Sequence, residues 1–175
     1  SDNAAYEGEV NGLLDREWFA NVEYKYNTFL VVPEVCLKED LTDDRVCDVK
    51  ESKPHSASGG PITVTSVIED TAGKGIIALK IGIKNSGVGR VTMPDAEFSS
   101  RKNTLSFSLD DDAWECKSSG KVNEARLIDG EAEILCKLLV PLTEDTLETK
   151  KVKLTMDYKY RDIIQETLRI KESAE

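Results

Sequence analysis

The sequence predicts an all-β protein folded as a β-sandwich, and three observations support this prediction. Apolar and polar residues alternate with a period of two in several segments, which is the pattern of a half-buried strand. These segments recur roughly every ten residues and are joined by turns rich in Gly, Asp and Ser. No long stretch has helical spacing of its apolar residues. Two sheets that cover each other's apolar face would satisfy this pattern.

The N-terminal part is predicted to change from helix to strand. Near-helical spacing of apolar residues predicts a short helix near residues 9–19, although Gly12 within it costs about 1 kcal/mol relative to Ala. From Phe19 the period becomes two, and a β-rich run continues past Pro33, which marks an edge, a bulge or a bend. Four residues of this run are predicted to share one face of the strand: Ala20, Val22, Tyr24 and Tyr26.

The clearest strand lies within residues 75–91. Four residues that alternate with Ala, Lys and Gly form its apolar face: Ile77, Leu79, Ile81 and Ile83. The strand ends in residues 85–89, whose Asn, Ser and Gly types reach positive φ easily. An earlier strand is predicted around residues 62–68.

Further strands are predicted in the second half of the chain. They cover residues 105–109, 114–116, 125–128, 132–140 and 152–160. Asp129-Gly130 is a strong signal for a two-residue hairpin turn. Arg161-Asp162 is predicted to turn the chain once more, so that it ends in a hairpin.

The domain organisation follows from these elements. Residues 1–4 resemble an expression-vector remnant, and residues 1–17 are expected to be this remnant and an N-terminal extension. Residues 18–175 are expected to form the sandwich, with 51–61, rich in Pro, Gly and Ser, as the candidate internal boundary.

Composition restricts the function classes. The 175 residues are 39% hydrophobic, which is enough for a core. The formal net charge of -10 predicts repulsion of nucleic acid and of anionic lipid, so no nucleic-acid partner is expected. No apolar run approaches the roughly 18 residues of a membrane span, so direct membrane insertion of this segment is not expected.

The four cysteines, Cys36, Cys47, Cys116 and Cys136, allow three disulfide pairings. We favour Cys36–Cys47 and Cys116–Cys136, because each pair lies close in sequence and flanks a loop or hairpin. Zinc is a weaker alternative, since the chain has no C-x-x-C, and buried free thiols are a third. Disulfides would indicate a location outside a reducing cytosol.

Two acidic stretches are the candidates for calcium: Asp110, Asp111 and Asp112, and Asp40, Asp43 and Asp44. Neither has the D-x-D-x-D-G order of a specific calcium loop, so exposed turns are the favoured interpretation. We expect no metal and no cofactor.

Catalysis is poorly supported. The single histidine, His55, lies in the Pro/Gly/Ser stretch without a nucleophile or acid at catalytic spacing. Residues 87–89 begin like a dinucleotide fingerprint, but Met93-Pro94 cannot open a helix there. We expect no enzyme. The pairs Tyr24/Tyr26 and Tyr158/Tyr160 fit a core better than a ligand-binding face.

A family resemblance accompanies these patterns. Residues 81–91 contain a strand followed by Asn-x-Gly-x-Gly-x-Val, which resembles the signature of CARDB-type immunoglobulin-like domains. Other segments in the same order look like extracytoplasmic domains of membrane-anchored archaeal proteins: Tyr24–Thr28 as Tyr-Lys-Tyr-Asn-Thr, Cys36 and Cys47, residues 59–64, Trp114 with Cys116, and Tyr158-Lys159-Tyr160. The resemblance spans most of residues 18–171. It implies an immunoglobulin-like sandwich, disulfides, a tethered surface location and no known catalytic residues.

The expected function is therefore an extracytoplasmic structural or adhesion module of a larger surface protein, tethered by a segment outside this sequence. A carbohydrate- or peptide-binding sandwich is the alternative, and it would use an exposed aromatic residue such as Trp18 or Trp114. A hydrolase ranks third. The expected partner is a protein or a glycan at a cell surface.

Overall fold

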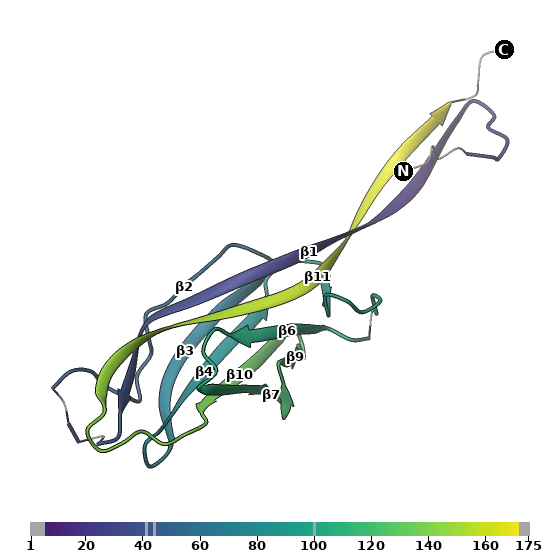
Figure 1. The fold of residues 1–175 in the computed structure, drawn as a ribbon. Coiled ribbons are helices and arrows are strands. Elements are labelled where there is room, and N and C mark those ends of the chain that lie inside the picture. The colour runs from purple at the N-terminus through teal and green to yellow at the C-terminus, as the bar shows by residue number, and fades with distance from the viewer. Residues whose placement is uncertain (1–5, 41, 44, 100, 172–175) are drawn as a thin grey trace. The chain divides into compact units, whose positions relative to one another are not determined.

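The computed structural model describes residues 6–40, 42–43, 45–99 and 101–171. These residues form an all-β structure of two antiparallel sheets packed together, which confirms the predicted sandwich (Figure 1). The chain divides into two compact units. One comprises residues 1–22 with 162–175, and the other comprises residues 23–161. The stretch 51–61 lies inside the second unit.

Eleven strands are assigned among the described residues. They are β1 (Leu13–Lys38), β2 (Ser56–Ala57), β3 (Ile62–Gly73), β4 (Ile76–Asn85), β5 (Arg90–Thr92), β6 (Thr104–Leu109), β7 (Trp114–Ser118), β8 (Lys121–Val122), β9 (Glu124–Arg126), β10 (Glu131–Leu138) and β11 (Leu147–Lys171). The first sheet has the order β2-β1-β11-β6-β9, with β5 beside β11. The second has the order β3-β4-β10-β7-β8.

The core lies between the two sheets within residues 23–161. Ile77, Leu79, Ile81 and Ile83 of β4 are all buried, as their alternation predicts. β4 lies between β3 and β10, so its backbone is paired on both sides. The first sheet contributes the buried faces of β6 and β11: Leu105, Phe107, Val152, Leu154, Met156, Tyr158 and Tyr160.

The turn at Asp129-Gly130 forms where the sequence predicts it. Asp129 and Gly130 both have positive φ, 51° and 83°, and Ile128 and Glu131 pair across them. Positive φ at both central positions is the backbone of a tight hairpin turn. This turn leads from β9 in the first sheet to β10 in the second.

The predicted inward position of Val140 is wrong. β10 ends at Leu138, and Val140 is 72% exposed beside Pro141.

The predicted helix near residues 9–19 is wrong, because β1 already begins at Leu13. Gly12 has a φ of +80°, which breaks the predicted helix before its second turn. Within the first unit, Arg169 of β11 donates two hydrogen bonds to Asp15 of β1, at 2.8 and 3.0 Å. Pairing with a strand far along the chain therefore overrides a weak helical pattern.

The predicted C-terminal hairpin is also wrong, since β11 runs unbroken from Leu147 to Lys171. Arg161 is held in extended form, because it pairs with Arg90 of β5 and donates to Glu23 of β1 at 2.6 Å. Arg161-Asp162 contains no glycine, and neither residue has positive φ. Over the part of the chain that the structure describes, there is no helix with the length and apolarity of a membrane span.

Candidate functional site

Both favoured disulfides are present, Cys36–Cys47 and Cys116–Cys136. Cys36 lies in β1, so its bond attaches the following acidic loop to the first sheet. Cys116 and Cys136 are register partners on β7 and β10, so their bond links two neighbouring strands of the second sheet. None of the four cysteines is left as a free thiol or as a metal ligand.

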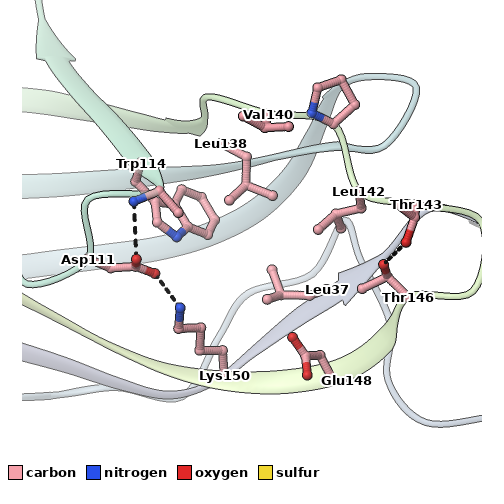
Figure 2. Close-up of a pocket in the computed structure, with 12 residues that line it drawn as sticks. Leu37, Asp111, Trp114, Leu138, Val140, Leu142, Thr143, Thr146, Glu148 and Lys150 are labelled. Carbon is pink, nitrogen blue, oxygen red and sulfur yellow. Dashed lines mark hydrogen bonds and ion pairs between the residues drawn. The ribbon is translucent and has the colours of Figure 1, made fainter.

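An open pocket of about 350 Å³ lies at one end of the sandwich, and Figure 2 shows its lining. Its apolar wall consists of Leu37, Leu138, Val140 and Leu142, and its polar wall includes Glu148, Thr143 and Thr146.

Asp111 and Lys150 form the charged part of this pocket. The Lys150 ammonium lies 2.7 Å from the Asp111 carboxylate (Figure 2). The backbone N–H of Ala113 donates to the same carboxylate at 3.1 Å. Mainly because of Lys150, the pKa of Asp111 lies below its usual value of 3.8. A carboxylate stabilised in its ionised form is a poor general acid, so this pair is better suited to holding β11 against the β6–β7 turn.

The first acidic stretch is therefore a hydrogen-bonded turn. Asp110 accepts a hydrogen bond from the backbone N–H of Lys153 at 2.9 Å, Asp111 pairs with Lys150, and Asp112 is exposed. The structure does not bring the three carboxylates together around one point. Among the described residues, no group of three or more His, Cys, Asp or Glu side chains is arranged to hold a metal ion.

The second acidic stretch is organised around a lysine. Lys38 is almost fully buried, and its ammonium donates to the carbonyl oxygens of Asp43 and Cys47 at 2.5 and 2.7 Å. Arg45 binds the Asp43 carboxylate and is the main reason that its pKa falls to about 2. Asp40 accepts hydrogen bonds from Thr42. Asp44 lies outside the described residues.

The aromatic candidates are divided between core and surface. Trp114 is only 6% exposed and belongs to the core, so it offers no exposed platform for a ligand. Trp18 is 37% exposed and lies in the first unit. Tyr158 and Tyr160 are buried, as predicted, whereas Tyr26 is half-buried and stacks on Tyr158 with ring centroids 5.8 Å apart. The predicted inward position of Tyr24 does not lead to burial.

His55 is exposed, and its Nδ1 lies 3.1 Å from the carbonyl oxygen of Lys53. No nucleophile or carboxylate hydrogen bond to this imidazole is present among the described residues. The position of His55 therefore gives no support to nucleophilic catalysis.

A second hollow, of about 680 Å³, is lined by cationic residues that the sequence prediction did not group together. We call it the basic hollow, and its lining residues are Thr92, Met93, Ala96, Glu97, Ser99, Arg101, Lys102, Thr104, Lys121, Glu124 and Arg126. Thr92 and Thr104 are buried at its floor, and the four cations are exposed at its rim. Lys121 pairs with Glu124 at 2.5 Å. No periodic pattern in the sequence marks these residues, because two separate stretches, 92–104 and 121–126, supply them.

Comparison of the chain with protein-family models, with curated proteins and with solved structures gives no match. The function therefore has to be argued from the fold and from these sites.

Proposed function

We propose that this chain is an extracytoplasmic interaction module without catalytic activity, part of a larger protein at a cell surface. The observation that carries the proposal is the pair of disulfides, Cys36–Cys47 and Cys116–Cys136. Disulfides form and persist in oxidising compartments and are rare in a reducing cytosol. The resemblance of residues 18–171 to CARDB-type immunoglobulin-like domains supports the same proposal.

The exposed apolar residues of the first unit favour a role in binding a partner over a role as a spacer. Asp15 and Arg169 bond across β1 and β11, so they share one face of this two-stranded ribbon. Since side chains alternate along a strand, the opposite face has more apolar than charged residues, the charged ones being Arg16, Asp162 and Glu166. It carries Leu14, Trp18, Ala20, Val22, Ile164, Leu168 and Ile170, most of them exposed. Exposed apolar faces of this kind are typical of interaction surfaces.

The surface location can be tested with antibodies raised against the purified protein. They should label intact cells of the source organism, and the labelled protein should contain no free thiols. Labelling that appears only after the cells are lysed would contradict the proposal, as would a protein isolated with four reduced cysteines.

A carbohydrate- or peptide-binding sandwich is the second candidate function, and the basic hollow favours it. Trp114, which the sequence suggested as a ligand-binding residue, is buried and cannot form the binding site of such a module. The hollow instead offers exposed cations and the partly exposed hydroxyl group of Ser99. A binding role would therefore depend on charge and hydrogen bonds.

A further inference from the structure

The basic hollow is built on β6 and β9. Thr104 and Arg126 are register partners on these strands, and so are Leu105 and Ala125. Leu105 and Ala125 are fully buried in the core, so Thr104 and Arg126 must point to the other face of the sheet. A residue on that face would ordinarily be exposed, yet Thr104 is only 8% exposed. The segment that precedes β6 therefore encloses the floor of the hollow.

This enclosing segment is attached to the sandwich at several points. The Arg161 guanidinium lies over the Phe98 ring, 3.6 Å from its centroid. The ammonium of Lys25 lies 3.6 Å from the carboxylate of Asp95. At its end, the backbone N–H of Leu127 donates to the carbonyl of Asn103 at 2.8 Å. The wall that presents Arg101 and Lys102 is thus anchored at both ends.

The charge of the hollow is opposite to that of the protein. Its lining contains four cations and two carboxylates, whereas the whole chain has a net charge of -10. Within the part of the chain that the structure describes, no carboxylate forms an ion pair with Arg101, Lys102 or Arg126. Screening limits the reach of charges to about 8 Å at physiological salt, so the local cations decide what binds here. The net charge that disfavours polyanions in general does not exclude an anion at this place.

The remaining chemistry of the lining favours a carbohydrate. Thr92 and Thr104 are buried, but Ser99 is partly exposed and supplies a hydroxyl group that can donate and accept hydrogen bonds. None of the described lining residues is aromatic, so nucleic-acid bases would have no surface on which to stack. A volume of about 680 Å³ is sufficient for a small oligosaccharide.

We propose that the basic hollow binds an acidic oligosaccharide. Its carboxylate or sulfate groups pair with Arg101, Lys102 and Arg126, and its hydroxyl groups bond to the partly exposed Ser99. This inference rests on the second candidate function, carbohydrate binding, and names the ligand class and the residues. It does not depend on the apolar ribbon face, because none of the lining residues belongs to it.

Isothermal titration of the intact chain tests the proposal with four probes: a heparin-derived hexasaccharide, an oligogalacturonate, a neutral maltohexaose and an oligodeoxythymidylate. The test variant is Arg101→Gln/Arg126→Gln. The matched control is Lys137→Gln/Lys151→Gln, which removes the same charge at two exposed positions outside the hollow. Circular dichroism and the melting temperature show that both variants are folded.

We expect at least one acidic oligosaccharide to bind and the neutral one not to. The sulfated and carboxylated probes show which anionic group is preferred. The test variant should bind at least about tenfold more weakly, because charged hydrogen bonds are lost, whereas the control should change less than about twofold.

Three results would overturn the inference: no binding of either acidic oligosaccharide, equal losses in the two variants, or equally tight binding of the oligonucleotide. Binding of the neutral oligosaccharide that neither variant weakens would keep a carbohydrate-binding function and reject the basic hollow as its site.

Discussion

Lys53 and Glu69 form a buried ion pair, with the ammonium nitrogen 2.8 Å from Oε2 of the carboxylate. The two residues are 4% and 0% exposed. Glu69 of β3 also accepts hydrogen bonds from the backbone N–H of Cys36 in β1, at 2.9 and 3.1 Å. Burial raises the pKa of Glu69, and Lys53 and the Cys36 N–H oppose this rise. Glu69 therefore connects the two sheets beside a disulfide.

We predict that Glu69→Gln lowers the free energy of unfolding by about 1.5–3 kcal/mol, because the buried Lys53 ammonium loses its buried carboxylate and keeps only the more exposed Glu51 as a charged partner. Urea unfolding measures the change. The control is Lys84→Gln, which removes the exposed pair with Glu131 and should cost at most about 1 kcal/mol. Equal effects of the two substitutions would show that the buried pair has no special role.

Asp111 should make stability depend on pH. Its pKa is lowered in the folded state, so its contribution is fully present above about 3.8, the unfolded value, and is lost as the pH falls through the folded value. Lys150→Gln should therefore reduce the loss of stability between about pH 5 and about pH 2. Urea midpoints at the two pH values measure this, with the exposed Lys151→Gln as the control. An unchanged pH dependence in Lys150→Gln would contradict the prediction.

Each disulfide should stabilise the fold separately. The loops that they close span 11 residues for Cys36–Cys47 and 20 for Cys116–Cys136. Replacing either pair by alanine should cost about 3 kcal/mol in the chain-entropy model. Guanidinium unfolding of the two double variants gives the values, and non-reducing peptide mapping verifies the remaining bond. A loss below about 1 kcal/mol would show that the bond constrains the unfolded chain very little.

Ile81→Asp should be far more damaging than Lys80→Gln, although the positions are adjacent. Ile81 is buried between the sheets, so the change removes about 1.5–3 kcal/mol of apolar burial and adds an unpaired buried carboxylate. Lys80 is partly exposed and pairs with Asp70 at 2.7 Å, so its loss should cost at most about 1 kcal/mol. We expect Ile81→Asp to be unfolded or insoluble. If Lys80→Gln proved the more destabilising, the orientation of β4 would be wrong.

Local patterns were sufficient to predict several features of this protein. The alternation around Ile81 predicts both the strand and its buried face, because side-chain direction in a strand depends only on residue parity. Asp129-Gly130 predicts its turn, since both residues adopt positive φ at low cost. The disulfide pairing could be predicted because each cysteine and its partner are joined by a short loop. Local sequence patterns were therefore enough to predict the fold class, the core of β4 and β11, and the disulfides.

Long-range pairing decided the rest. Residues 13–19 form a strand and not a helix because their partners lie about 150 residues away in β11, as Asp15 and Arg169 illustrate. The basic hollow has the same cause. Arg101 is about 20 residues from Lys121 in the sequence, and it comes to lie in one hollow with Lys121 and Arg126 only when β6 pairs with β9. A local pattern carries no information about which distant segments meet, and only the tertiary structure could place these cations around one hollow.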